Sequence, residues 1–178
     1  MKKQILVGVE SFEEIRESDF FYVDKSLFIK ELMEKRGKVT LITRPRRFGK
    51  TLNMSMLKSF FDISRDSKDL FEGLAIAEHQ DLCEKHMNKY PVIFLSMKNI
   101  EQDSYEDSIG RIKTIISAVF RQNSYIYKSD ILDELQKEMF YSYSMRRSTE
   151  EELQYSLLFL TECLYTYHQK RVIVLMDE

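Results

Sequence analysis

The triplet Gly49-Lys50-Thr51 is the part of the sequence best suited to bind phosphate. In phosphate-binding loops, a lysine at this position contacts the β- and γ-phosphates, and the hydroxyl that follows binds Mg²⁺. The triplet comes after the apolar run 39–43, which is predicted to be a buried strand, and before an amphipathic stretch. It is therefore predicted to open a helix, where backbone N–H groups and the helix dipole favour an anion.

The loop before this triplet departs from the pattern G-x-x-x-x-G-K-[ST], because Arg44 replaces the first glycine. Arginine supplies a tight turn less readily than glycine, and Pro45 removes one backbone donor. In exchange, the loop gains guanidinium groups, which bind phosphate oxygens bidentately. We therefore predict that side chains replace some backbone contacts. The predicted nucleotide-binding residues are Arg44, Pro45, Arg46, Arg47, Phe48, Gly49, Lys50 and Thr51.

The final run of the sequence, "VIVLMDE", carries a second chemical feature. Asp177 would lie at the tip of a buried strand, where a carboxylate can order Mg²⁺ together with the hydroxyl of Thr51. Glu178 follows directly and could act as the general base that polarises an attacking water. Each motif is weak alone. Because both occur in the right order, and each follows a predicted strand, together they predict a nucleotide site.

Composition limits the classes of function. The chain has 178 residues, 43% of them hydrophobic and 31% charged, and a net charge of −2, so we expect one globular domain without a global attraction to nucleic acid. No apolar run reaches the roughly 18 residues of a membrane span, and we expect a cytoplasmic protein without membrane association. Cys83 and Cys163 lack metal or disulfide spacing and are expected to be reduced core thiols.

Apolar runs separated by amphipathic stretches predict an α/β protein with a mostly parallel sheet. With no repeat and no linker, residues 1–178 are predicted to form one domain, with an N-terminal element at about 1–37 and a core at 38–178. Strands are expected at 20–24, 39–43, 91–97 and 171–178. Helices are expected at 11–18, 25–37 and 50–62, with two more between 66 and 89 and three between 104 and 169.

Five segments resemble, in order, the prokaryotic AAA-ATPase-like family, and they span nearly the whole chain: YVDKS, LITRPRRFGKTLNMSMLKSFF, LFEGL, PVIFLSMK and VIVLMDE. The arginine-rich loop looks like the family's own. The resemblance implies a P-loop ATPase of the three-layer sandwich type that uses ATP and Mg²⁺, with Glu178 as the catalytic residue. Longer relatives often add a C-terminal nuclease-like domain of the PD-(D/E)XK type.

The family usually continues D-E-Y-D, whereas this sequence ends at Glu178. We therefore expect an N-terminal fragment with an incomplete sheet and at most feeble ATPase activity. In ATPases of this branch, the resemblance implies, a later strand lies between the P-loop strand and the strand before Asp177. Without it, segments 39–43 and 172–176 are expected to be unpaired or to pair directly.

Two further interpretations stay open. The arginine-rich loop could instead belong to a non-catalytic module that docks nucleic acid or a phosphorylated partner. Asp24 and Lys25 could approach the adenine or ribose, or could pack and cap the N-terminal element. The three histidines lack partners at ligand spacing and are expected at the surface: His79, His86 and His168.

Overall fold

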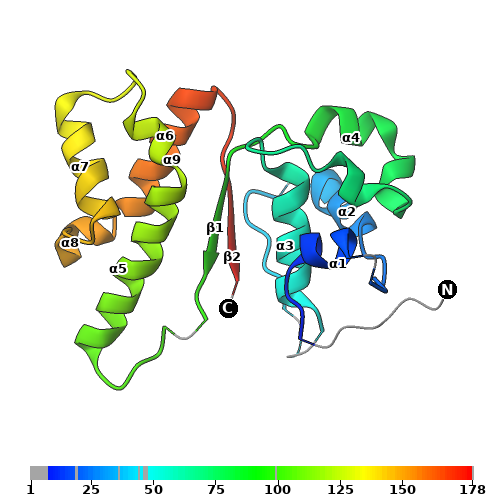
Figure 1. The fold of residues 1–178 in the computed structure, drawn as a ribbon, viewed down its shortest axis with the longest axis horizontal. Coiled ribbons are helices and arrows are strands. Elements are labelled where there is room, and N and C mark those ends of the chain that lie inside the picture. The colour runs from blue at the N-terminus through cyan, green and yellow to red at the C-terminus, as the bar shows by residue number, and fades with distance from the viewer. Residues whose placement is uncertain are drawn as a thin grey trace. The chain divides into compact units, whose positions relative to one another are not determined.

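The computed structural model describes residues 8–18, 20–35, 37–43, 45, 48–98 and 100–177. The chain divides into two compact units, Met1–Val92 and Ile93–Glu178, and each is described here by itself (Figure 1). The prediction of a single domain stays a prediction. Four predicted site residues lie outside the described residues: Arg44, Arg46, Arg47 and Glu178.

The first unit is built from helices. Helix α3 contacts α1, and the short helix η2 contacts both α2 and α4 (Figure 1). The prediction of a helix at 50–62 is confirmed by α3. Between residues 66 and 89, three short helices are present where two were expected. The elements are α1 (Phe12–Glu17), α2 (Leu27–Lys35), α3 (Lys50–Phe61), η1 (Lys68–Phe71), η2 (Ala75–Glu78) and α4 (Gln80–His86).

Aromatic side chains form the centre of the first unit. The rings of Phe12 and Phe60 both contact the ring of Phe71, with centroids 5.0 and 5.3 Å away. All three side chains are almost fully buried. Helix α3 contributes a continuous apolar face to this core, because Met56 and Leu57 are buried one turn before Phe60. The loop that precedes α3 is thus attached to a well-packed helix.

The second unit combines a two-stranded sheet with helices. Strands β1 (Val92–Ser96) and β2 (Ile173–Asp177) pair in parallel and confirm two of the predicted strands (Figure 1). Five helices replace the three expected, because polar caps break the helical pattern at Asp133 and Thr149. They are α5 (Tyr105–Gln122), α6 (Ser124–Tyr127), α7 (Glu134–Ser144), α8 (Glu150–Leu153) and α9 (Ser156–His168).

The predicted strands at 20–24 and 39–43 are wrong, because neither segment forms a strand. Val39 is 90% exposed and Leu41 84% exposed, so the segment expected at a sheet centre has no apolar cover. The sheet of β1 and β2 does not include it. A β-branched run favours a strand only where a neighbouring strand satisfies its N–H and C=O groups.

Alternate side chains of β2 are also exposed, including Met176 at 52%.

The fold class is a mixture of helices and strands with a small parallel sheet, which is compatible with the predicted α/β class. Among the described residues, no helix is both long and apolar enough to cross a membrane. Neither cysteine is in a disulfide: Cys163 is buried and Cys83 is half-buried.

Candidate functional site

The start of helix α3 has the backbone geometry of an anion-binding turn. Gly49 is its N-cap in the left-handed conformation (φ 73°, ψ 27°), which glycine adopts without steric cost. Lys50 and Thr51 are the first two residues of the helix, and both are half-buried. Its N-cap residue forms no side-chain hydrogen bond, and the N–H groups of its first turn have no acceptor within the helix. Side chains cap four other described helices: Ser11, Ser104, Asp133 and Thr149. Like α3, helices α4, α6 and α9 have no such cap.

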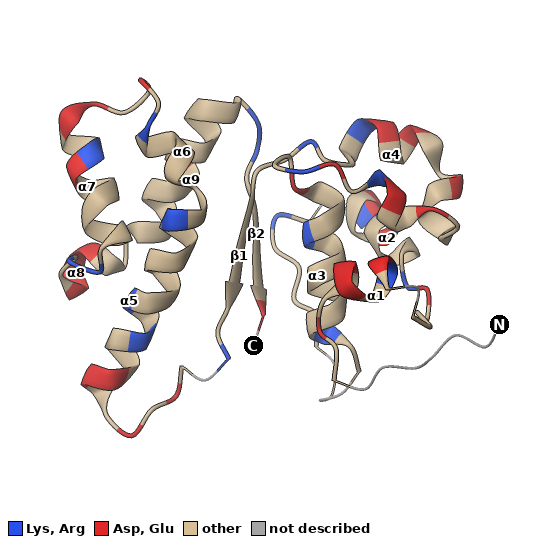
Figure 2. Ribbon diagram, in the orientation of Figure 1, with Lys and Arg blue, Asp and Glu red and all other residues tan. Residues whose placement is uncertain are grey.

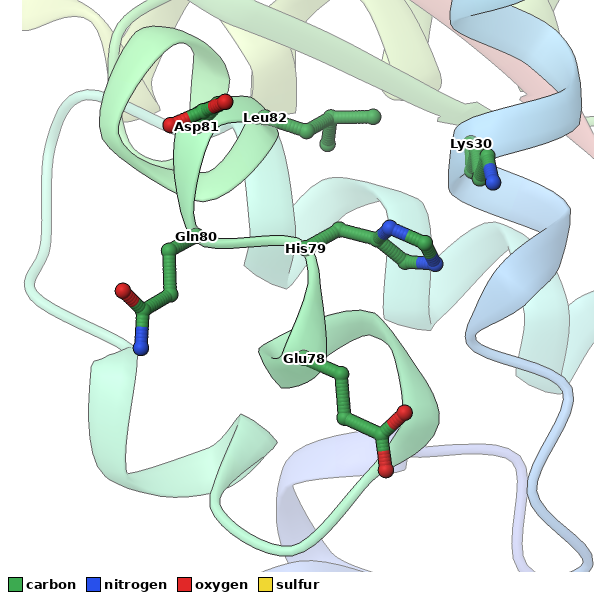
Figure 3. Close-up of a pocket in the computed structure, with 6 residues that line it drawn as sticks. All are labelled: Lys30, Glu78, His79, Gln80, Asp81 and Leu82. Carbon is green, nitrogen blue, oxygen red and sulfur yellow. The ribbon is translucent and has the colours of Figure 1, made fainter.

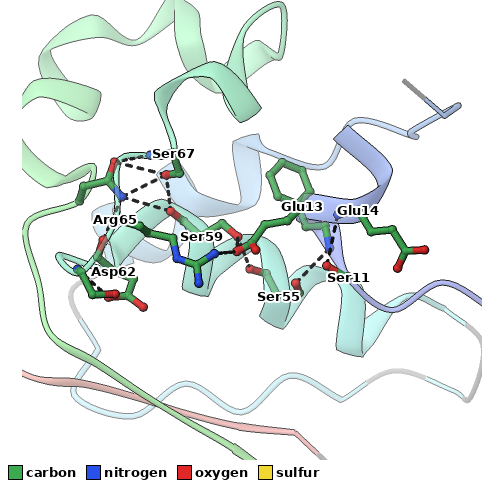
Figure 4. Close-up of polar contacts among 11 residues, drawn as sticks. Ser11, Glu13, Glu14, Ser55, Ser59, Asp62, Arg65 and Ser67 are labelled. Atoms are coloured by element: carbon green, nitrogen blue, oxygen red, sulfur yellow. Dashed lines mark hydrogen bonds and ion pairs between the residues drawn. The ribbon is translucent and has the colours of Figure 1, made fainter. Parts of the chain in front are cut away.

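Hydrogen bonds from α1 hold α3 in place. The backbone N–H of Phe12 donates to the Ser55 hydroxyl at 3.0 Å, and the Ser59 hydroxyl donates to Oε1 of Glu13 at 2.9 Å. Glu13 also forms an ion pair with Arg65 (Figure 4). These bonds fix the middle and the C-terminal half of α3, so the position of its N-terminal residues depends little on the exposed loop before it.

The segment around Asp24 and Lys25 contacts α3, η2 and Phe48, which precedes α3. The Tyr22 hydroxyl donates to Sδ of Met56 on α3 at 3.2 Å, and burial raises the pKa of Tyr22 to about 12. Asp24 accepts a hydrogen bond from the N–H of Ala75, at the start of η2, at 2.7 Å. The packing and capping interpretation is therefore confirmed for Asp24. Lys25 Nζ lies 3.5 Å from the carbonyl oxygen of Phe48.

The pKa of Asp24 lies below its ordinary value. Burial acts to raise this pKa, but hydrogen bonds from the Ala75 N–H and from the hydroxyl and N–H of Ser26 stabilise the carboxylate more strongly. The positive charge of Arg16 adds to this effect. Asp24 is thus held as an anion that ties the segment to η2.

Asp177 is the last residue of β2, and no other residue of β1 or β2 is charged (Figure 2). It is almost fully buried, and its Oδ2 atom has no hydrogen-bond donor within the described part of the chain. Lys98 Nζ lies 3.8 Å from this oxygen, and the Met97 N–H donates to the Asp177 backbone carbonyl at 2.7 Å. A buried carboxylate oxygen without a donor suits a cation, so Asp177 fits the role predicted for it with Mg²⁺.

No three His, Cys, Asp or Glu side chains converge on a metal position in the described residues. Mg²⁺ usually takes one or two carboxylates and completes its shell with waters and substrate phosphates. The two parts of the predicted site lie in different units: Lys50 and Thr51 belong to the first, and Asp177 to the second. Their joint action on one nucleotide stays a prediction.

A wide cavity of about 420 Å³ lies elsewhere in the first unit, between α2 and the segment that joins η2 to α4. The ring of His79 points toward Lys30 across it (Figure 3). Glu78 and Asp81 bring carboxylates to its wall, which would repel phosphate. The prediction of surface histidines is wrong, because all three are half-buried. Two of them bond a tyrosine hydroxyl: His86 to Tyr90 at 2.6 Å and His168 to Tyr125 at 2.8 Å.

The sequence model of the AAA-ATPase-like family, described as predicted AAA-ATPases, matches residues 6–178. The chain belongs to this family. Membership in the AAA-ATPase-like family suggests that the chain binds ATP. It is also similar to a protein of Azotobacter chroococcum mcd 1 named "Uncharacterized protein in vnfD 5'region", with 32% identity over 117 residues, or 65% of this chain and 21% of that protein. The chain thus spans about a fifth of the length of this relative. No solved structure matches this chain.

Two contacts of this AAA-ATPase-like chain were missed from the sequence. One is the ion pair between Lys98 and Asp177. The sequence could have indicated this contact, because both residues come at the ends of predicted parallel strands, and such ends share one edge of a sheet. The other is the approach of Lys25 to Phe48. No local pattern indicates it, because it depends on how the segment packs against α3 and η2.

Proposed function

We propose that this chain binds ATP and Mg²⁺ through residues 44–51 and hydrolyses ATP, as a P-loop ATPase of the three-layer sandwich type. The observation that carries the proposal is the start of α3, where a left-handed Gly49 precedes Lys50 and Thr51 and forms no side-chain cap of its own. This turn offers N–H groups and the positive end of a helix dipole to an anion. Family membership supports ATP as the source of that anion.

Each residue has a defined role in this proposal. The Lys50 ammonium binds the β- and γ-phosphate oxygens, and the guanidinium groups of the loop share that charge. The Thr51 hydroxyl and the Asp177 carboxylate would hold Mg²⁺, which when bound neutralises charge on the phosphate oxygens. Glu178 accepts the proton of the attacking water as general base. The burial of Asp177, with one oxygen lacking a donor, supports its place in this set.

The test compares two lysines of the first unit. Mg·ATP affinity is measured by calorimetry for the parent chain, Lys50→Ala and Lys30→Ala, with melting curves to verify folding. Lys50→Ala should weaken binding roughly tenfold or more, because one strong charge-assisted contact is lost. Lys30 lines the separate cavity beside His79, so Lys30→Ala should bind like the parent. Unchanged binding by Lys50→Ala, or a loss in Lys30→Ala, would overturn the proposal.

A further inference from the structure

The ammonium of Lys25 lies over the last turn of the loop that precedes α3. Its Nζ is 3.5 Å from the Phe48 carbonyl oxygen. It is also 3.6 Å from the point that a Cβ atom on Gly49 would occupy. The side chain thus reaches the two residues that come directly before Lys50. Lys25 itself precedes α2 in the sequence, whereas Phe48 and Gly49 follow it.

The residues on each side of Lys25 are fixed. Asp24 accepts hydrogen bonds from the N–H groups of Ser26, at 2.8 Å, and Ala75, at 2.7 Å. Ser26 is fully buried, and its hydroxyl accepts from the N–H of Ile76 at 3.0 Å. The backbone of Lys25 is therefore attached to η2 at two adjacent points. This attachment holds the backbone of Lys25 where its side chain reaches the turn at Gly49.

No carboxylate compensates the charge of Lys25 within the described residues, where its one polar contact is the Phe48 carbonyl. The ammonium instead lies beside Gly49, at the N-terminus of α3, which is the positive end of the helix dipole. Lys50, the next residue, carries a second ammonium. A cation at the positive end of a helix is destabilised there, and a bound anion would offset this repulsion. The geometry is unfavourable for an empty turn and favourable for one that holds a polyanion.

We propose that Lys25 is a second phosphate-binding lysine, which contacts the phosphate chain of the bound nucleotide together with Lys50. This inference rests on the proposed function and adds a residue to its site. It assigns Lys25 to the phosphates and not to the adenine or ribose, because its ammonium lies at the turn that the phosphates occupy. Lys25 therefore contributes equally to the binding of ATP, of GTP and of inorganic tripolyphosphate.

The test measures the affinity of the full chain for Mg·ATP, Mg·GTP and tripolyphosphate by calorimetry, with melting curves for every variant. Lys25→Ala should weaken binding of all three probes by a similar factor, roughly tenfold. Lys25→Arg keeps the positive charge and should recover most of the affinity. Lys30→Ala, which removes a lysine of the same unit outside the turn, should change nothing.

The outcomes separate this inference from the function on which it rests. If Lys50→Ala loses affinity and Lys25→Ala does not, Lys25 is no phosphate ligand and the nucleotide site stands. A loss in Lys25→Ala for ATP alone, with tripolyphosphate binding unchanged, assigns Lys25 to the nucleoside and overturns the inference. If the parent binds none of the three probes, both proposals fail. An equal loss for all three probes, recovered by Lys25→Arg, supports the inference.

Discussion

The ammonium of Lys98 lies 3.8 Å from Oδ2 of Asp177, and only 2% of the Asp177 side chain is exposed, against 33% for Lys98. That distance is too long for a hydrogen bond, and Oδ2 accepts none from the described residues. A buried carboxylate oxygen with one long ionic contact recovers only part of the hydration that it lost. We therefore expect Asp177 to lower the stability of the second unit.

Asp177→Asn should increase the free energy of unfolding by about 1 kcal/mol in the absence of Mg²⁺, because it removes a poorly compensated buried charge. Urea unfolding in EDTA measures this change. Asp130→Asn, at an exposed aspartate of the same unit, is the control and should have no effect. The same Asp177 variant should lose the Mg²⁺ dependence of ATP binding. Destabilisation of Asp177→Asn would show that the carboxylate has a structural role.

Gly49→Ala should destabilise the first unit by about 1–2 kcal/mol, because an L-residue is strained at φ 73°. A methyl group there would meet Lys25 Nζ at 3.6 Å, an ordinary contact, so the cost comes from the backbone. Gly110→Ala is the matched control. It lies inside α5 with open space around it, and the change should stabilise the chain by up to about 1 kcal/mol. Denaturant midpoints of the two variants should therefore shift in opposite directions.

Asp24→Asn should lower stability at neutral pH by up to about 1 kcal/mol, an amount limited by solvent screening of this exposed group. The folded-state pKa of Asp24 is below its ordinary value of 3.8, so its contribution is present above that pH and disappears as the pH falls through the lower pKa. Urea midpoints of parent and variant should thus differ at pH 7 and converge in acid. Asp69→Asn, an exposed aspartate of η1, should show no such convergence. A constant difference at all pH values would contradict this explanation.

The sequence was most informative where local chemistry decides the structure. Helix α3 was predicted to within one residue, because Gly49 and Lys50 mark its start and its apolar face repeats with helical period. Strands β1 and β2 were found because each is a short apolar run between helices. The wrong predictions concern segments whose structure depends on distant partners. Residues 39–43 have the composition of a strand but no partner strand, so their apolar side chains are exposed.

The segment 20–24 failed as a strand for another reason. Its polar side chains bond to α3 and η2 instead of lying on a sheet, with Tyr22 on Met56 and Asp24 on Ala75. The same limit applies to the site. Residue types alone indicated Lys50, Thr51 and Asp177. The nearness of Lys25 to the turn arises from packing, which one sequence does not reveal. The nearness of Lys98 to Asp177 could have been inferred, because both residues come at the ends of strands that pair in parallel.

Hydrogen exchange of the backbone amides of Lys50, Thr51 and Leu52 tests the phosphate-binding turn most directly. These N–H groups have no acceptor within α3, and the N-cap residue forms no side-chain hydrogen bond to them, so a bound phosphate should slow their exchange. We predict that Mg·ATP slows exchange at these three amides and not at residues 78–82, beside the separate cavity. We also predict that Lys50→Ala abolishes this protection. Unchanged exchange at residues 50–52 under saturating Mg·ATP, or protection confined to residues 78–82, would contradict the account.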